Sequence, residues 1–151
     1  FWAKVSLRDE SSQVPLIISA PGKKPAVCNS FVELLDLYPT LAGMCGLKAQ
    51  ERLQGKDVSK MLDHPNHSVR EAAFCVAPAR KGFLLRDEKW AYIQYGEKAE
   101  NGIELFDVEK DPKQYVNLAK KKKYQPAVKA FQKKMADKLV AVRDNDLGRR
   151  K

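Results

Sequence analysis

The fold is decided by residues 71–108, which read EAAFCVAPARKGFLLRDEKWAYIQYGEKAENGIELFDV. Four short runs rich in apolar, aromatic and branched residues occupy this stretch, at residues 72–76, 82–86, 90–95 and 103–108. Such runs are typical of strands, and the segments between them are long enough for hairpins but too short for crossover helices. We therefore expect a sheet of four antiparallel strands.

A helix is predicted after the sheet, from Pro126 to about Val142. Proline suits the first turn of a helix, and apolar residues recur at steps of three and four while lysines occupy the other faces. The apolar stripe consists of Val128, Phe131, Met135, Leu139 and Val142. We expect this stripe to lie on the sheet, so that residues 71–151 form an α+β subdomain whose tail, residues 144–151, is frayed.

Residues 14–22, VPLIISAPG, form an uninterrupted apolar run closed by a Pro-Gly turn signal. A continuous run of this kind indicates a strand that is covered on both faces, as in a parallel α/β sheet. The chain supplies no neighbouring strand of the same type and begins without Met. We therefore expect the partner strands to lie in sequence that is missing here.

A second helix is predicted to begin at Asp36 as the N-cap and to stop at Gly46, with Pro39 in the first turn. Residues 1–70 are then the incomplete end of a larger α/β domain. We expect residues 71–142 to be the stable part and residues 1–30 the weak part of the chain.

The composition excludes several classes of protein. With 151 residues, 44% hydrophobic and 31% charged, the chain can bury a core, and it contains no apolar run of roughly 18 residues that would span a membrane. The three Cys stand in no zinc-ligand or redox spacing, although they leave room for one disulfide.

The net charge of +9 comes from one end of the chain. Residues 1–112 carry 15 Lys+Arg and 16 Asp+Glu, whereas residues 113–151 carry 13 and 3. Four consecutive lysines, Lys120 to Lys123, lie in this basic segment. A solvated surface is the favoured interpretation, and nucleic-acid binding is not expected because no matching motif accompanies the lysines. The alternative function is a polyanion-binding module formed by residues 113–151.

Several collinear segments, which together span about residues 2–119, resemble type I sulfatases. They are WAKVSL at 2–7, ES at 10–11, the run at 14–22, ELLDLYPTLAG at 33–43, GL at 46–47, LQG at 53–55, ELFD at 104–107, DP at 111–112 and NLA at 117–119. The resemblance is closest to the iduronate-2-sulfatase-like branch.

This resemblance implies the C-terminal part of a sulfuric ester hydrolase with a large domain like that of alkaline phosphatase, to which the strand and helix of residues 1–70 belong. It also implies formylglycine, made from a C/S-x-P-x-R motif, bound calcium, and a sulfated small molecule or glycan as substrate. The location implied is periplasmic, secreted or lysosomal, with no membrane partner. None of the three Cys stands in that motif. We therefore expect the chain to hold no cofactor, to be inactive alone and to need the N-terminal sulfatase domain.

Lys4 matches the lysine that reaches the substrate sulfate in this family. A lysine cation suits that role, because it holds the anion and offsets charge on the leaving-group oxygen. Without the resemblance, Lys4 is an ordinary exposed lysine near a chain end.

Other candidate residues favour structural roles. His64 and His67 lie in a polar, turn-like stretch without further ligands, so a surface loop is favoured over a metal site. Asp107 and Asp111 bracket a turn, so turn capping is favoured over acid–base chemistry. Three strand aromatics favour core packing over a stacking platform for bases or sugars. They are Trp90, Tyr92 and Tyr95.

Overall fold

The structure of the protein is a computed structural model that describes residues 6–77 and 81–144. The chain divides into two compact units. The sheet unit contains residues up to Val14 and from Phe74 onward, and the 15–73 unit contains the residues between them. The second boundary lies close to the predicted change at residue 71, whereas the N-terminal residues group with the sheet rather than with the rest of residues 1–70.

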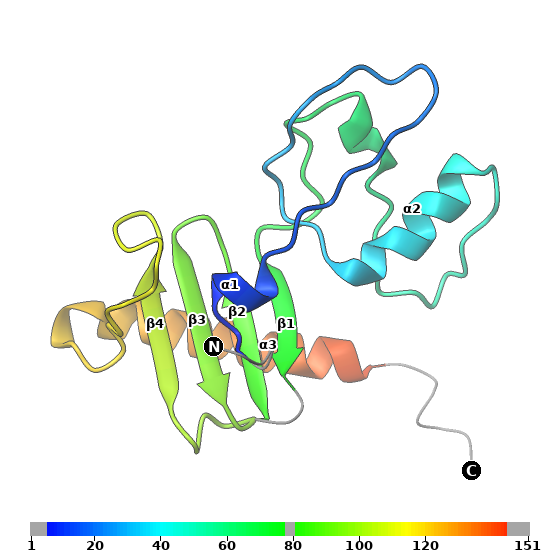
Figure 1. The fold of residues 1–151 in the computed structure, drawn as a ribbon. Coiled ribbons are helices and arrows are strands. Elements are labelled where there is room, and N and C mark those ends of the chain that lie inside the picture. The colour runs from blue at the N-terminus through cyan, green and yellow to red at the C-terminus, as the bar shows by residue number, and fades with distance from the viewer. Residues whose placement is uncertain (1–5, 78–80, 145–151) are drawn as a thin grey trace, which may run out of the picture. The chain divides into compact units, whose positions relative to one another are not determined.

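The sheet unit contains the predicted four-stranded sheet, in the order β1-β2-β3-β4 (Figure 1). Its strands are β1 (Ala73–Ala77), β2 (Gly82–Arg86), β3 (Trp90–Tyr95) and β4 (Ile103–Asp107). Strand β3 pairs antiparallel with both β2 and β4, and Tyr92 faces Leu85 on one side and Leu105 on the other. Each strand lies within one residue of its predicted position.

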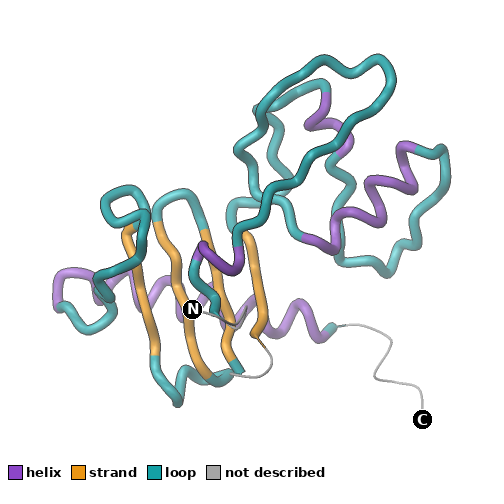
Figure 2. Tube along the Cα trace, in the orientation of Figure 1, coloured by secondary structure: helices purple, strands orange, loops and turns teal. Residues whose placement is uncertain are grey.

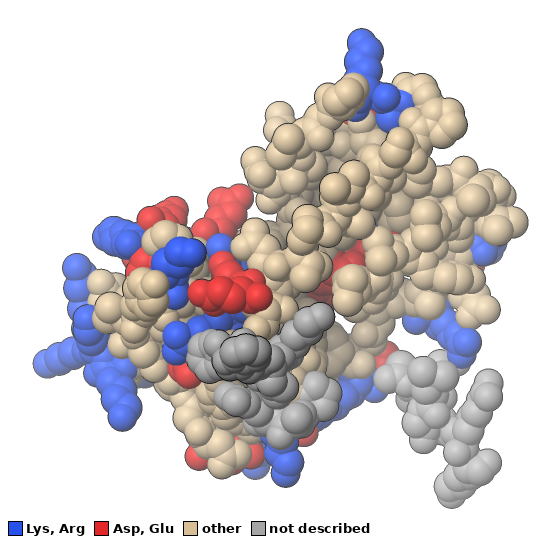
Figure 3. All heavy atoms as spheres, in the orientation of Figure 1, with Lys and Arg blue, Asp and Glu red and all other residues tan. Residues whose placement is uncertain are grey.

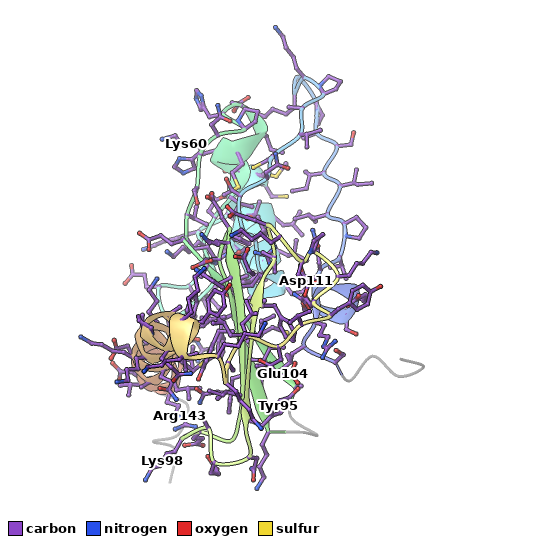
Figure 4. All side chains as sticks on the ribbon, turned by 90° about the vertical axis from the view of Figure 1, so that its left-hand side faces the viewer. Lys60, Tyr95, Lys98, Glu104, Asp111 and Arg143 are labelled. Atoms are coloured by element: carbon purple, nitrogen blue, oxygen red, sulfur yellow. The ribbon has the colours of Figure 1, made fainter. Side chains whose placement is uncertain are left out.

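Helix α3 (Gln125–Arg143) covers one face of this sheet, as Figure 4 shows in its view along the sheet edge. Val128, Phe131, Met135 and Leu139 are buried on the sheet, as predicted, and Val142 is half-buried. The rings of Tyr92 and Phe131 stack with their centroids 5.7 Å apart. The predicted tail of residues 144–151 lies outside the described residues, except for Asp144.

The opposite face of the sheet is covered by the N-terminal segment, which includes the single-turn helix α1 (Asp9–Ser12) (Figures 1 and 4). Leu7 is only 3% exposed and belongs to a second core cluster. The other buried members are Ala77, Leu84, Ala91, Ile93, Phe106 and Val108. Because both faces are covered, Ala91, Tyr92 and Ile93 are all fully buried although they alternate between faces.

The 15–73 unit is mostly loop, as Figure 2 shows. Its helical segments are η1 (Leu34–Asp36), α2 (Leu37–Met44) and η2 (Ser59–Leu62). Helix α2 has Asp36 as its N-cap residue, as predicted. Gly46 follows its end with φ +70°, a conformation that glycine adopts without strain. The Asp36 side chain, however, makes no capping bond to α2.

Residues 14–22, predicted to be a strand that pairs with strands outside this sequence, form no strand in this structure. Residues 15–72 contain no strand, and Ile17, in the middle of the apolar run, is 89% exposed. A strand needs a neighbour to satisfy its backbone N–H and C=O groups. The described residues of the 15–73 unit offer none, so the run lies extended and uncovered.

Candidate functional site

Lys4, the predicted sulfate-contacting residue, lies outside the described residues. Leu7, three residues further along, is buried among the side chains of the sheet. The segment also makes a local turn, in which Ser6 Oγ accepts a hydrogen bond from the Arg8 N–H at 3.1 Å. The described site therefore begins with the residues that hold this segment.

Five polar residues hold the N-terminal segment against the sheet, and we call them the N-terminal clamp. They are Arg8, Asp9, Arg86, Glu104 and Gln114. The Gln114 amide bonds Asp9 twice: its Oε1 accepts from the Asp9 backbone N–H at 3.1 Å, and its Nε2 donates to Asp9 Oδ1 at 2.9 Å. The second oxygen of Asp9 accepts from Arg86 Nε at 3.3 Å.

Arg8 completes the clamp from the other side. Its Nη1 donates to the Gln114 backbone carbonyl at 3.0 Å, and its Nη2 lies 3.5 Å from Glu104 Oε2. Its guanidinium carbon lies 4.9 Å from the centroid of the Phe106 ring, which adds a cation–π contact. The clamp thus joins the segment after Lys4 to β2, β4 and the loop after β4.

Gln114 is fully buried and has φ +55°, a left-handed conformation that is uncommon for a residue with a side chain. This backbone places the Gln114 carbonyl against Arg8 and its side chain against Asp9. The next residue, Tyr115, is 79% exposed. The loop therefore points Gln114 inward, where it holds the N-terminal segment, and Tyr115 outward to solvent.

The sulfatase-like signature at residues 104–119 has a structural role. Asp107 Oδ1 accepts from the Lys110 N–H at 3.2 Å, and Asp111 Oδ2 accepts from the Val116 N–H at 2.8 Å. Asn117 Oδ1 accepts from the N–H groups of Leu105 and Ala119, at 3.1 and 2.9 Å. The predicted preference for turn capping by Asp107 and Asp111 is confirmed.

The strand aromatics pack inside the sheet unit, as predicted. Trp90 meets Tyr124 edge to face with centroids 5.9 Å apart, and Tyr92 is stacked on Phe131. Burial raises the pKa of Tyr92 to about 12, so its hydroxyl stays protonated. The Tyr95 hydroxyl lies 3.4 Å from Glu104 Oε1, and Figure 4 shows these two side chains next to each other.

The 15–73 unit is organised around a buried ion pair between Asp36 and Arg70. Arg70 Nη2 donates to Asp36 Oδ1 at 2.6 Å, and its Nη1 bonds the other carboxylate oxygen. The carboxylate also accepts from the backbone N–H groups of Glu33 and Lys56, at 2.7 and 2.8 Å. Burial raises the pKa of Asp36, but these hydrogen bonds outweigh it and hold the pKa below its ordinary value of 3.8.

Much of the surface of the 15–73 unit is apolar. Large apolar side chains that are exposed come from its first extended stretch and from around α2. They are Leu16, Ile17, Val27, Leu34, Leu35, Tyr38, Leu41, Met44 and Leu47. The buried apolar side chains that the structure describes in this unit are Pro39, Ala42, Val58 and Met61. An exposed apolar surface of this kind is typical of an interaction site.

No metal-binding group of three or more His, Cys, Asp or Glu residues occurs in the described part of the chain. The His67 N–H donates to the His64 carbonyl at 2.8 Å, which places both histidines in a turn, as predicted. The three Cys, at 28, 45 and 75, form no disulfide with one another. No described helix has both the length and the hydropathy that crossing a membrane would require.

Comparison with known proteins identifies the family. Residues 1–141 match the family described as N-sulphoglucosamine sulphohydrolase, C-terminal. The chain belongs to this family. The match covers nearly the whole chain, including Lys4, the N-terminal clamp and most of α3.

Curated relatives of this sulphohydrolase C-terminal chain are sulfatases. Arylsulfatase K of Bos taurus is 32% identical over 131 residues, which are 78% of this chain and 24% of the relative. A sulfatase of Formosa agariphila is 27% identical over 134 residues, which are 86% of this chain and 25% of the relative. The chain spans about a quarter of the length of these relatives.

Solved structures of similar fold include a 2-O GAG sulfatase, with a TM-score of 0.60 and 25% identity over 77% of this chain and 26% of that chain. A phosphonate monoester hydrolase from Silicibacter pomeroyi has a TM-score of 0.79 and 21% identity over 93% of this chain and 31% of that chain. The second likeness concerns the fold alone. The four-stranded sheet with its C-terminal helix is therefore the arrangement expected of this sulphohydrolase C-terminal family.

The sequence did not reveal the N-terminal clamp or the Asp36–Arg70 pair. Asp9 and Gln114 are 105 residues apart in the chain, and Asp36 and Arg70 are 34 apart. No spacing rule links residues so distant. The one usable signal was that Asp9 and Gln114 each lie between sulfatase-like matches, at 2–7 and 10–11 and at 111–112 and 117–119. These matches marked both regions but did not pair them.

Proposed function

We propose that this chain is the C-terminal part of a sulfatase that hydrolyses sulfate esters. The observation that carries the proposal is the family match over residues 1–141. The relatives named as sulfatases support it, and they are about four times as long as the part that matches. The catalytic domain of such an enzyme would then lie in a preceding part of the protein.

The exposed apolar surface of the 15–73 unit supports a partner domain of this kind. Ile17 and its neighbours form an apolar run without neighbouring strands, and η1 and α2 leave Leu34, Tyr38 and Leu41 uncovered. Burial of such side chains would contribute roughly 25 cal/mol for each Å² of apolar surface removed from water. Residues 14–22 would pair as a strand with the sheet of the preceding domain.

The substrate that we propose is a sulfated glycan. The resemblance to the iduronate-2-sulfatase-like branch favours a sulfate ester on a uronic acid. The similarity to a 2-O GAG sulfatase at 25% identity supports the same class of substrate. A sulfated small molecule is the other candidate.

Within this chain, Lys4 would bind the substrate sulfate and offset negative charge on the leaving-group oxygen. The N-terminal clamp supports this role indirectly. It fixes the backbone from Arg8 and Asp9, so the segment that carries Lys4 is anchored four residues further along. A positioned cation is worth more to a reaction than a mobile one, since it needs no reorganisation during the chemical step.

The family resemblance also implies formylglycine and calcium. The described residues do not fit a calcium site, because they hold no cluster of potential ligands. None of the Cys residues fits the formylglycine motif. Both groups would belong to the preceding domain, and this chain alone would be inactive.

The test is sulfate release by the longer protein. We expect hydrolysis of a 2-O-sulfated uronate disaccharide, and about a 100-fold loss of kcat or more in Lys4→Ala, as for removal of one transition-state-stabilising donor. The isolated chain is the control and should release no sulfate. A longer protein without an upstream C/S-x-P-x-R motif, or one that releases no sulfate from sulfated glycans or small aryl sulfates, would contradict the proposal.

A further inference from the structure

The lysines of the segment from residue 113 to 144 have no acidic partners in the described structure. None of the ion pairs found among the described residues includes one of these lysines. The ion pair at the end of α3 joins Arg143 to Glu97. The unpaired lysines are Lys113, Lys120, Lys121, Lys122, Lys123, Lys129, Lys133, Lys134 and Lys138. Ion pairing inside the protein therefore does not account for this charge.

Three of these lysines lie over aromatic rings, and one of the three is Lys123, whose Nζ is 5.8 Å from the centroid of the adjacent Tyr124 ring. Lys134 Nζ lies 5.4 Å from the centroid of the Phe131 ring, and Lys138 Nζ lies 5.4 Å from that of Phe74. The stems of Lys134 and Lys138 cover the edge of the core, which is an ordinary use of lysine. These two lysines are left out of the binding surface considered below, whereas Lys123 is exposed and contacts only the adjacent ring.

Six of the seven remaining lysines, all except Lys113, lie just before α3 or in its first turns. Residues Lys122–Tyr124 form the short helix η4, which leads directly into α3. Lys129 and Lys133 are exposed and four residues apart, so they lie one above the other on the helix. From Lys122 to Lys133 the chain advances roughly 16 Å at the helical rise of 1.5 Å per residue. Figure 3 shows Lys and Arg side chains gathered on the side of the sheet unit where the loop after β4 and the start of α3 lie.

This row of lysines is held on a rigid support. Gln125 Nε2 donates to the Ala119 carbonyl at 2.6 Å, and the Tyr124 N–H donates to the Lys121 carbonyl at 3.0 Å. Tyr124 is also packed edge to face against Trp90. The backbone of the lysine segment is therefore ordered before any ligand arrives, which lowers the entropy cost of binding.

The position of the lysines does not favour folding. The N-terminus of a helix carries partial positive charge, so cations there are destabilising, and neighbouring lysines repel one another. Residues 125–143 contain one acidic residue, Asp137, to offset them. Folding energetics do not explain this concentration of lysines, whereas a function in binding an anion does.

We propose that Lys120–Lys123, Lys129 and Lys133 form a binding surface for a sulfated polysaccharide chain. The inference rests on the proposed function for the choice of a sulfated polymer over other polyanions. Lysine ammonium groups are compact charges that do not demand the planar geometry that Arg uses. A row of them suits sulfate groups repeated along a polymer, and a second attachment raises the effective concentration of that polymer at the enzyme.

Single-stranded nucleic acid is a poorer fit to the same surface. Such ligands are usually held by aromatic side chains on which the bases stack. The aromatic residues nearest in sequence to these lysines, Tyr124 and Phe131, are occupied by packing against Trp90 and Tyr92. The surface therefore offers charge without stacking.

The experiment compares two variants of the 151-residue chain in which the same number of charges is removed. The surface variant carries Lys→Gln at Lys122, Lys123, Lys129 and Lys133. The control variant carries Lys→Gln at four exposed lysines without ion pairs elsewhere in the chain. They are Lys24, Lys60, Lys98 and Lys110. Calorimetric titration at low salt uses a heparin decasaccharide, its desulfated form, and a single-stranded DNA of equal charge.

We expect the surface variant to bind the heparin decasaccharide at least ~10-fold more weakly than the unchanged chain, with a shallower salt dependence, and the control to change less than ~2-fold. Thermal midpoints should be unchanged or slightly higher in the surface variant. Equal weakening in both variants would overturn the proposal, since it would reflect net charge alone. Equal or tighter binding of DNA, or undiminished binding of the desulfated form, would overturn the choice of ligand. Sulfatase activity of the longer protein is measured separately. A failure of the proposed function would therefore appear as absent sulfate release, and a failure of the binding proposal as equal weakening in the two variants.

Discussion

The sheet unit and the 15–73 unit bury their apolar side chains to very different degrees. In the sheet unit both faces of the sheet are covered, one by α3 and the other by Leu7 and the segment around α1. In the 15–73 unit the apolar side chains around α2 and in the run at residues 14–22 remain mostly exposed. A unit that satisfies its own hydrophobic surface can fold alone, whereas the other has the character of half an interface.

The polar contacts follow a different pattern. Each unit has a buried polar network that ties residues distant in sequence: the N-terminal clamp in one and the Asp36–Arg70 pair in the other. Local structure around α2 is therefore specified by polar contacts even where apolar cover is missing. The comparison indicates that the 15–73 unit has a defined local structure although much of its apolar surface is exposed.

The largest expected effect is on the core of the sheet unit. Phe131→Ala removes the ring stacked on Tyr92 and should lower the free energy of unfolding by about 3 to 5 kcal/mol. Leu34→Ala, at a site that is 76% exposed, is the control and should change it by less than about 0.5 kcal/mol. Urea unfolding followed by far-ultraviolet circular dichroism measures both. Equal effects would remove the contrast between the two units.

The next effect separates the two units directly. Arg70→Leu leaves the buried Asp36 carboxylate without its partner and should destabilise the 15–73 unit by about 3 kcal/mol. Amide exchange should accelerate around Glu33 and Lys56, whose N–H groups bond Asp36. Amides of β3 should keep their protection. Acceleration throughout the chain would mean that the units unfold together.

A smaller effect is expected from the N-terminal clamp. Gln114→Ala removes both bonds to Asp9 and should weaken attachment of the N-terminal segment by about 1 to 3 kcal/mol. Tyr115→Ala, at the exposed neighbouring position, is the matched control and should have no such effect. The readout is the rate of proteolysis within residues 6–14. If the protease cleaves the Gln114→Ala variant within residues 6–14 no faster than the Tyr115→Ala variant, the clamp does not hold the segment.

The smallest effect concerns pH. The pKa of Asp36 is lowered in the folded state, so its contribution to stability is fully present above the ordinary value of 3.8 and is lost as pH falls through the lowered pKa. NMR amide signals of Glu33 and Lys56 should therefore stay constant from pH 7 to about 4.5 and change below pH 4. Asp36→Asn should abolish that acid step. A change centred near pH 6 would contradict this assignment.

The sequence predicted the parts of the fold that depend on local pattern. The strands around Trp90 and Tyr92, the buried stripe of α3 and the start of α2 at Asp36 all follow from periodicity and capping. Sequence pattern alone decides less where the outcome depends on what lies beside a segment. The run at residues 14–22 has the pattern of a buried strand but lacks a neighbour, and Leu7 covers a sheet face that no pattern assigned to it.

The expectation that residues 1–30 are the least stable part of the chain applies differently to residues 6–12 and to residues 15–30. Leu7, Arg8 and Asp9 are tied to the sheet, so residues 6–12 should share its stability. Residues 15–30 have no comparable burial, since nearly all of them are exposed. Among the candidate site residues, the identity of Lys4 came from family resemblance, whereas the contacts that anchor the segment after it required the structure.

Hydrogen–deuterium exchange of the isolated chain and of the longer protein tests the central claim most directly. We expect β1 to β4, α3 and residues 7–12 to be protected equally in both, and residues 14–22 together with the surface around α2 to gain protection only in the longer protein. Identical exchange of residues 14–22 in the two forms would contradict the account, because the apolar surface of the 15–73 unit would then have no partner in the rest of the protein.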